Sequence, residues 1–322
     1  MKPKVLIYKK SFPQEVIDKV LAPHFDVFVL GIGTPEFKEH LKDTVGLIGW
    51  GGRIDRQFLE QAPQLKAFST ISVGYDHCDL TAMNELGIRL MHTPDVLTEA
   101  VADSALALML ATTRRVVELD RHIRQGQWVK SVSPEWYGQN MYKKTLGIVG
   151  MGRIGKAIAK RAHFGFDMNI LYHSRTAHPD AEKETHARLI GLDELLQSSD
   201  FVCCVLPKTP QTLHYFQREQ FEMMKPSAIF INVGRGQVVK ENDLAHALVH
   251  KTIYAAGLDV FEVEPLPLDS PLLGLDNVVL FPHASSATVE TRFAMDEDAA
   301  ENLVNILTKP NTIKNCVNPK LC

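Results

Sequence analysis

Short apolar runs alternate with helix-forming stretches along nearly the whole chain. Such alternation indicates βαβ units, in which the strands lie parallel and a helix connects each strand to the next. The runs predict eleven strands, at residues 5–8, 27–30, 45–48, 67–71, 88–91, 146–149, 170–172, 201–206, 228–233, 253–257 and 278–281. Because this is too many for one compact sheet, the pattern predicts an α/β protein with two doubly wound, parallel-sheet lobes.

Two longer stretches predict helices. Residues 98–124 read as one helix, with Thr98 as the N-cap and Glu99 in the first turn. Its centre, residues 105–111, is apolar on every face, which predicts burial between the lobes or in a subunit interface. Residues 289–307 are again helical, and their position after the last strand suits a return of the chain to the first lobe.

A glycine-rich segment separates a strand from a helix in the middle of the chain. Gly150, Gly152 and Gly155 form a GxGxxG motif between the apolar run 145–149 and the helix-forming stretch 156–162. In this context the glycines permit a tight turn, a close approach of pyrophosphate to the backbone, and close packing of helix on strand. The helix N-terminus also attracts phosphates. The motif predicts a dinucleotide site; its alternative is a glycine-rich turn without a ligand.

The end of the next strand bears on the choice of dinucleotide. It carries His173, Ser174 and Arg175, at the distance where NAD-preferring sites place an acidic residue for the ribose 2′-hydroxyl. Residues 168–179 contain no carboxylate, and a hydroxyl with a guanidinium suits a 2′-phosphate. We therefore expect NADP(H) as the preferred cofactor. The alternative is that Arg175 is a solvated loop charge and that the site also accepts NAD(H).

Composition narrows the classes of function. The chain has 322 residues and suits two domains, and its net charge of −3 gives no basic field for nucleic acid. No apolar run approaches the roughly 18 residues of a membrane span, and no signal peptide precedes the first strand. The five cysteines form no CxxC and are odd in number, which favours a reducing compartment. We expect a cytoplasmic protein without nucleic-acid, membrane or metal partners.

Three polar segments follow predicted strands downstream of the glycines. They are residues 232–236, 258–265 and 281–286, and they carry Arg235, Glu264 and His283. Ligands of open α/β sheets bind at the carboxyl ends of the strands, so these side chains are expected to share one edge.

These three residue types suit the reduction of a carbonyl beside a carboxylate. Arginine holds a carboxylate and polarises the carbonyl, histidine donates a proton near neutral pH, and an acidic residue orients the imidazole. Arg235, His283 and Glu264 supply this set. Taken singly, each would read as a surface charge or a loop residue, but together behind a dinucleotide motif they predict catalysis.

At these segments the chain resembles the D-isomer-specific 2-hydroxyacid dehydrogenases, and within them the bacterial glyoxylate/hydroxypyruvate reductases that also act on 2-ketogluconate. The resemblance runs through residues 71–76, 147–155, 232–236, 257–265, 282–283 and 314–319, and so covers essentially the whole chain. It implies two Rossmann-like lobes, with a cofactor lobe (residues 101–287) inserted into a flavodoxin-like substrate lobe (residues 1–100 and 288–322). It also implies a homodimer formed through the cofactor lobe.

The resemblance further implies roles for individual residues. Arg235 binds substrate, Glu264 is the partner acid and His283 is the proton donor, while the backbone N–H groups of Val73 and Gly74 hold the substrate carboxylate. Asp259 bonds to the nicotinamide carboxamide. The cofactor-binding residues expected are Gly150, Met151, Gly152, Arg153, Ile154, Gly155, His173, Ser174, Arg175, Pro207, Thr212, Val233 and Asp259.

The implied reaction is the NADPH-preferring reduction of glyoxylate, hydroxypyruvate and 2-ketogluconate to D-2-hydroxy acids. Two departures bear on it: residues 283–286 read His-Ala-Ser-Ser where the family usually has His-Ile-Gly-Ser, and the loop of Trp50 to Arg53 differs from the expected one and could change which 2-oxo acid fits. Two alternatives stay open, an NAD-linked dehydrogenase of another D-2-hydroxy acid and a dinucleotide-sensing binding protein.

Overall fold

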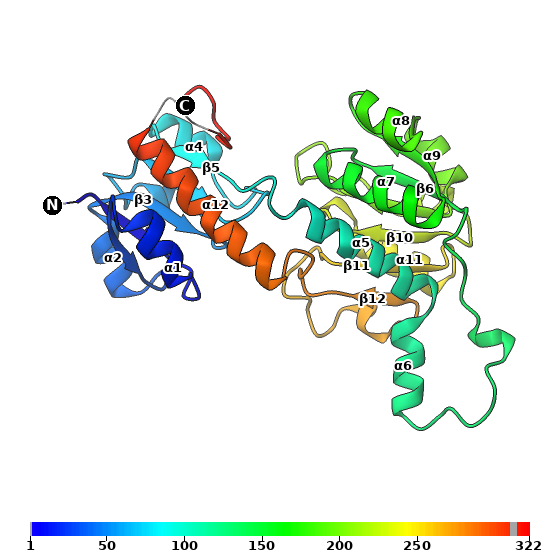
Figure 1. Ribbon diagram of the computed structural model, residues 1–322. Helices are drawn as coiled ribbons and strands as arrows, with labels where there is room; N and C mark the ends of the chain where they lie inside the picture. Colours follow the sequence, from blue (N-terminus) through cyan, green and yellow to red (C-terminus); the bar gives the residue numbers. More distant parts are fainter. Residues whose placement is uncertain (1, 310–313) are drawn as a thin grey trace. The chain divides into compact units, whose positions relative to one another are not determined.

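The computed structural model describes residues 2–309 and 314–322, which divide into two compact units (Figure 1). Unit 1 comprises Met1–Leu97 and Ala287–Cys322, and unit 2 comprises Thr98–Ser286. Each unit is built on a parallel sheet with helices on both of its faces. No helix among the described residues combines the length and the apolar character that crossing a membrane would require.

Unit 1 contains a five-stranded sheet in the order β2-β1-β3-β4-β5. All four strand pairings are parallel. The strands are β1 (Lys4–Ile7), β2 (Asp26–Val29), β3 (Thr44–Gly49), β4 (Ala67–Thr70) and β5 (Arg89–Met91). The helices are α1 (Gln14–Val16), the π-helical η1 (Ile17–Leu21), α2 (Pro35–Leu41), α3 (Arg56–Leu59), α4 (Leu80–Glu85) and α12 (Val289–Thr308).

The C-terminal helix α12 completes one face of this sheet. It packs on β3, β4 and β5, while α2, α3 and α4 contribute to the core on the other face. Gly46 makes room for the helix, because a Cβ at this position would lie 3.0 Å from side-chain atoms of Leu303 and Leu307. The ammonium of Lys9 lies 2.7 Å from the buried carboxylate of Asp296 in α12. The two ends of the chain therefore fold into one core.

Unit 2 contains a seven-stranded parallel sheet in the order β12-β11-β10-β9-β6-β7-β8. Its strands are β6 (Thr145–Val149), β7 (Asn169–His173), β8 (Arg188–Leu189), β9 (Phe201–Cys204), β10 (Ile229–Asn232), β11 (Ala255–Leu258) and β12 (Val278–Leu280). Its α-helices are α5 (Thr98–Thr113), α6 (Val116–Arg124), α7 (Arg153–Phe166), α8 (Pro179–Thr185), α9 (Leu192–Ser198), α10 (Arg218–Met223) and α11 (Glu241–Val249). Three 3-10 turns are η2 (Pro134–Trp136), η3 (Gly236–Val238) and η4 (Pro271–Gly274).

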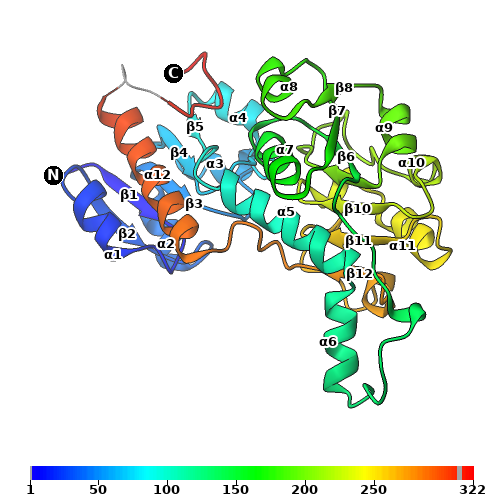
Figure 2. The same cartoon turned by 45° about the vertical axis from the view of Figure 1, so that its right-hand side comes forward.

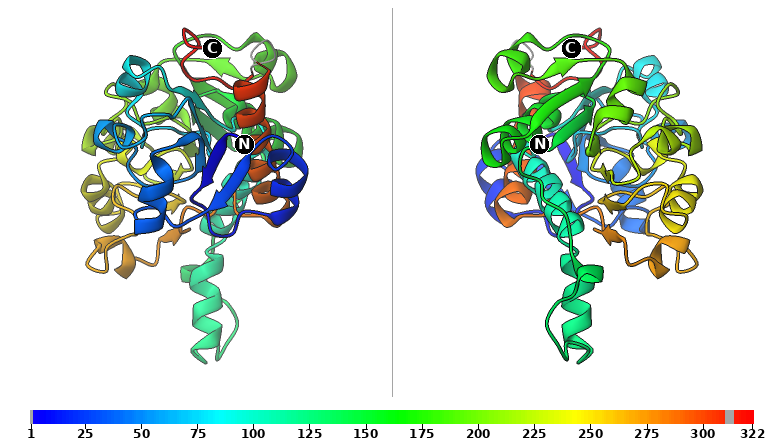
Figure 3. Two further views of the ribbon diagram at one scale, coloured as in Figure 1. Left: turned by 90° about the vertical axis from the view of Figure 1, so that its left-hand side faces the viewer. Right: turned by 90° about the vertical axis from the view of Figure 1, so that its right-hand side faces the viewer.

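Helices α5 and α7 pack side by side on one face of the unit 2 sheet, and the core on the other face includes α9, α10 and α11. Helix α6 and the loop after it project away from the body of unit 2 as an arm, residues 116–137 (Figures 2 and 3).

The predicted class of fold is confirmed: both sheets are parallel and doubly wound, and unit 2 is inserted into unit 1. All eleven predicted strands are present, with ends that move by one or two residues. The pattern missed β8, whose two residues are both exposed and form no apolar run.

The single helix predicted over residues 98–124 is wrong. It is broken between α5 and α6, where Arg115 adopts a left-handed conformation with φ of 53°. Thr98 begins α5 rather than capping it, and its hydroxyl has no hydrogen-bond partner among the described residues. Most of the apolar centre of α5 is buried by the unit 2 sheet and by α7, but Ala107 and Leu110 are exposed, so packing within this unit explains only part of its composition.

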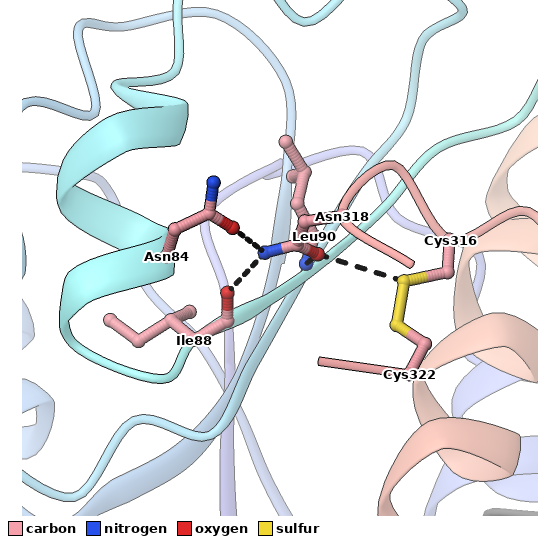
Figure 4. The surroundings of a disulfide bond; sticks show 6 residues. All are labelled: Asn84, Ile88, Leu90, Cys316, Asn318 and Cys322. Atoms are coloured by element: carbon pink, nitrogen blue, oxygen red, sulfur yellow. Dashed lines mark hydrogen bonds between the residues drawn. A yellow bond between two sulfur atoms is a disulfide. The ribbon is translucent and has the colours of Figure 1, made fainter. Parts of the chain in front are cut away.

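The C-terminal segment, residues 314–322, lies along β5. Asn318 is buried; its Oδ1 accepts the N–H of Leu90 at 2.9 Å, and its Nδ2 donates to Asn84 and Ile88 (Figure 4). Cys316 and Cys322 form a disulfide in this segment. This bond departs from the prediction drawn from cysteine usage, because a reducing compartment favours free thiols.

Candidate active site

The three predicted catalytic residues follow neighbouring strands of unit 2. Arg235 follows β10, Glu264 follows β11 and His283 follows β12, and these strands are adjacent and parallel. Their carboxyl ends therefore meet at one edge of the sheet, and the structure brings the three side chains together there.

His283 and Glu264 form a hydrogen-bonded pair. Nδ1 of His283 lies 2.7 Å from Oε2 of Glu264, and the two side chains are 42% and 34% exposed. The other carboxylate oxygen of Glu264 accepts the N–H of Phe261 at 3.0 Å. This arrangement fixes the orientation of the imidazole and leaves Nε2 on the side of the ring away from the carboxylate.

The surroundings of Glu264 favour its charged form. Burial raises the pKa of this carboxyl, but the hydrogen bonds from His283 and the Phe261 N–H, together with the charges of His283 and Arg235, outweigh burial and lower the pKa below its usual value. A carboxylate in this state stabilises a positive charge on the imidazole, which is what a proton-donating histidine requires.

Arg235 is held beside this pair by the turn after β10. Asn232 bonds to the turn at both ends, since its Oδ1 accepts the N–H of Gly234 and its Nδ2 donates to the carbonyl of Arg235. A Cβ on Gly236 would lie only 1.7 Å from the carbonyl oxygen of Phe261. Glycine is therefore required here for the Arg235 turn to contact the segment that carries Glu264.

Asp259 anchors the loop that carries His283. Its carboxylate is buried and accepts the backbone N–H of Ala284 at 2.8 Å and of Ser285 at 3.2 Å, while its carbonyl oxygen accepts the N–H of His283 at 2.8 Å. His283 itself has a positive φ of 52°, which few side chains adopt without support. The resemblance implied a cofactor contact for Asp259, and loop support is a role that the sequence did not indicate.

The three glycines of the motif meet three different environments. Gly150 has a φ of 104°, and a Cβ on Gly155 would lie 2.3 Å from the carbonyl oxygen of Gly150. A Cβ on Gly152, the residue before α7, would meet nothing within 4 Å. Gly150 and Gly155 are thus required by the turn and its packing, whereas the absence of a side chain at Gly152 leaves open space at the helix N-terminus.

Comparison with known proteins places the chain in a family. Residues 106–285 match the family model described as D-isomer specific 2-hydroxyacid dehydrogenase, NAD binding domain. The chain belongs to this family. It is therefore an oxidoreductase that uses a nicotinamide dinucleotide.

Relatives match this 2-hydroxyacid dehydrogenase over its whole length. Glyoxylate/hydroxypyruvate reductase B of Yersinia pestis bv. Antiqua (strain Nepal516) is 54% identical, over 100% of this chain and 99% of the relative. The crystal structure of a Thermus thermophilus protein, TT0316, is 41% identical, with a TM-score of 0.88, over 98% of this chain and 99% of that one. An NADPH-dependent glyoxylate/hydroxypyruvate reductase from Sinorhizobium meliloti, in complex with NADP and malonate, is 31% identical, with a TM-score of 0.85, over 99% and 97%.

The glycine loop of this dehydrogenase fits the dinucleotide of its family. The open space at Gly152 lies where α7, a helix of 14 residues, presents its first N–H groups, and this combination suits a pyrophosphate. Met151 is buried beneath the loop, Arg153 is exposed at the start of α7, and Ile154 is partly buried beside it. Farther along, Thr212 closes its own loop by donating to the carbonyl of Pro207 at 2.6 Å, and Val233 is buried after β10.

The residues at the end of β7 carry no negative charge. Nε2 of His173 lies 3.2 Å from the hydroxyl of Tyr215, and the Ser174 hydroxyl donates to the carbonyl of Thr176. The Arg175 side chain is exposed and has no hydrogen-bond or ion-pair partner among the described residues. The next carboxylate along the chain, Asp180, pairs with a lysine of α7 at 2.6 Å.

The loop after β4 in unit 1 carries two backbone donors. The carbonyl of Val73 accepts a ring nitrogen of His92 at 2.9 Å, and the carbonyl of Gly74 accepts the Ser72 hydroxyl at 2.7 Å. Within the described part of the chain, the N–H groups of Val73 and Gly74 donate to no acceptor. Two adjacent N–H groups held in this way suit one carboxylate, and the role that the resemblance implies for them stays a prediction.

The divergent loop after β3 contributes to a groove in unit 1. Trp50 is 47% exposed, and the guanidinium carbon of Arg292 lies 4.7 Å from the centre of its ring. These two residues, with Lys9, Phe293 and Asp296 among others, line an open groove of about 450 Å³. This cation–π contact ties the loop after β3 to α12, the helix that carries Arg292.

Proposed function

We propose that this enzyme reduces glyoxylate to glycolate and hydroxypyruvate to D-glycerate, and also reduces 2-ketogluconate, with NADPH as the preferred reductant. The observation that carries the proposal is the pairing of His283 with Glu264 at 2.7 Å beside Arg235. Reductases named for the first two substrates, 54% identical over the whole chain, support the choice of substrate.

Each residue has one task in the proposed reaction. The cofactor, when bound at the glycine loop, supplies a hydride to the carbonyl carbon. His283 donates a proton from Nε2 to the carbonyl oxygen, and Glu264 stabilises the imidazolium before that transfer. Arg235 binds and polarises the 2-oxo acid, and the N–H groups of Val73 and Gly74 in unit 1 hold the carboxylate.

The reaction is tested by initial rates with glyoxylate and with hydroxypyruvate, for the wild type and for His283→Ala. We expect the variant to lower kcat by roughly 100- to 10,000-fold, because it removes the general acid. Binding of NADPH, followed by its fluorescence, should be unchanged and serves as the control for folding. Retention of the wild-type rate by His283→Ala would exclude this mechanism, and an absence of turnover with tight NADPH binding would favour a dinucleotide sensor.

The preference for NADPH rests on Arg175. Its exposed guanidinium, with Ser174 and without a nearby carboxylate, suits the 2′-phosphate. We expect Arg175→Ala to raise the KM for NADPH at least tenfold while changing the KM for NADH less than twofold. Arg188→Ala, which changes an exposed arginine in β8, is the matched control. An equal effect of Arg175→Ala on both cofactors would contradict the assignment.

The arm supports the further proposal of a homodimer formed through unit 2. It exposes several large apolar side chains, which a subunit interface would cover: Val116, Val117, Ile123, Trp128, Val129, Val132 and Tyr137. Light scattering should give a dimer mass for the wild type and a monomer mass for Ile123→Glu with Trp128→Glu. A wild-type monomer would refute this proposal without affecting the chemistry.

A further inference from the structure

Unit 2 contains a second histidine–carboxylate pair close to the first. Nε2 of His214 lies 2.6 Å from Oε1 of Glu262, and the side chains are 36% and 32% exposed. His214 belongs to the loop after β9, the same loop that carries Pro207 and Thr212. Glu262 lies two residues before Glu264. The pair therefore joins a predicted cofactor loop to the segment that supplies the partner of His283.

Every polar group of Glu262 makes a hydrogen bond: both carboxylate oxygens, the carbonyl oxygen and the backbone N–H. Its Oε2 accepts the N–H of Glu241 at 3.1 Å, and its own N–H donates to the Glu241 carboxylate at 3.1 Å. Its carbonyl oxygen accepts Nε2 of Gln237 at 2.8 Å. Glu241 is the first residue of α11, where a carboxylate interacts favourably with free N–H groups. With His214 on Oε1, none of these groups is left without a bond.

The backbone of His214 is constrained as firmly as that of Glu262. It has a positive φ of 49°, and its N–H donates to the carbonyl of Gln237 at 2.9 Å. Gln237 thus bonds to both members of the pair, through its carbonyl and through its side chain. A positive φ at a residue other than glycine persists only where the surroundings hold it.

One short turn connects Glu262 to Glu264, so the position of Glu262 affects that of Glu264. Phe261, adjacent to Glu262, donates its N–H to Oε1 of Glu264, and the other oxygen of Glu264 meets His283. Movement of Glu262 would turn the Phe261 N–H away and release Glu264. We propose that His214 is a positioning residue: through Glu262 it holds the turn that aims Glu264 at His283. This inference rests on the proposed function for its kinetic readout.

The first test needs no substrate. The Nδ1 proton between His283 and Glu264 should give a downfield resonance, assigned by its loss in His283→Ala. We expect His214→Ala to shift or broaden this resonance and His214→Gln, which keeps an N–H donor, to restore it. His246→Ala changes an exposed histidine of α11 and is the matched control. An unchanged resonance in His214→Ala would overturn the proposal.

The second test follows reduction of hydroxypyruvate by NADPH. We expect His214→Ala to lower kcat about tenfold, to change the KM for NADPH less than twofold, and to raise the solvent deuterium isotope effect on kcat, because protonation becomes slower. His214→Gln should regain most of kcat. If His214→Ala only reduced the fraction of enzyme that is folded and active, the isotope effect would stay at the wild-type value. A wild-type isotope effect would therefore also overturn the proposal.

The two experiments separate the failure of this inference from failure of the proposed function. A wild type that reduces neither hydroxypyruvate nor glyoxylate refutes the proposed function, while the resonance still decides the role of His214. If His214→Ala does not fold, Glu262→Gln gives the same comparison, because it keeps an acceptor for the Glu241 N–H and removes the charge opposite His214.

Discussion

Nδ1 of His283 lies 2.7 Å from Oε2 of Glu264, so the proposed proton donor and its proposed partner acid form one hydrogen-bonded pair. Glu264 follows β11 and His283 follows the adjacent strand β12. Each of the two residues is also held by a hydrogen bond that a backbone N–H group donates. Asp259 supports the loop of His283, and the Phe261 N–H supports Glu264.

The lowered pKa of Glu264 predicts how this pair responds to acid. A group with a depressed folded-state pKa contributes stability above its unfolded pKa, about 4.3, and loses it as the pH falls through the lower folded value. We therefore expect the free energy of unfolding to fall more steeply below about pH 4.3 in the wild type than in Glu264→Gln. Denaturant titrations between about pH 6 and pH 3 measure this. Identical pH dependence in the two proteins would contradict the lowered pKa.

Removal of the Asp259 carboxylate should affect both stability and catalysis. Asp259→Ala leaves the N–H groups of Ala284 and Ser285 without an acceptor, and each unsatisfied group costs about 1–3 kcal/mol. We expect the free energy of unfolding to fall by about 2–5 kcal/mol. The kcat should fall as well, because the loop carries His283. Asp269→Ala, at an exposed loop position, is the control and should change neither quantity.

Replacing a glycine of the motif by alanine should have different effects at Gly155 and at Gly152: the first should lower stability, and the second should weaken cofactor binding. Gly155→Ala places a Cβ against the carbonyl of Gly150 and should destabilise the protein by about 1–3 kcal/mol. Gly152→Ala meets open space and should leave the melting temperature unchanged, but it should weaken NADPH binding about tenfold, because its methyl group would enter the proposed pyrophosphate site. Calorimetry and fluorescence titration measure the two effects. Equal losses of stability would contradict the division of roles.

Asn318, rather than the disulfide, should keep the C-terminal segment on β5. In the wild type treated with a reductant, the amide of Leu90 should stay protected from hydrogen exchange, because Asn318 still accepts its N–H. In Asn318→Ala the same amide should exchange rapidly even with the Cys316–Cys322 bond intact. Loss of protection on reduction alone would assign the anchoring to the disulfide.

The sequence predicted those parts of the fold that depend on local periodicity. Every strand with an apolar run was found, and the exposed β8 was not, because two residues paired at a sheet edge leave no pattern. The break at Arg115 was also missed. A left-handed arginine carries no signal comparable to that of glycine, and the break depends on contacts such as that of Arg115 with Trp136.

The same distinction holds for the site. Arg235, Glu264 and His283 could be predicted together, because neighbouring parallel strands end at one edge and each residue follows its strand closely. His214 could not be paired with Glu262 in this way, since it lies ten residues after the end of β9 and meets Glu262 only through the shape of two loops. The Cys316–Cys322 bond likewise depends on how the last residues turn back, which spacing alone does not determine.

The packing of α12 on β3, β4 and β5 has a consequence for synthesis of the chain on the ribosome. Unit 1 needs residues from both ends, so one face of its sheet stays incompletely covered until α12 has been made. The whole of unit 2, residues 98–286, is translated in the interval, which lasts roughly 10–40 s at about 5–20 residues per second. Unit 2 can thus reach its native state while the sheet of unit 1 is still incompletely covered. Unit 1, whose synthesis begins first, is completed last, when α12 leaves the ribosome.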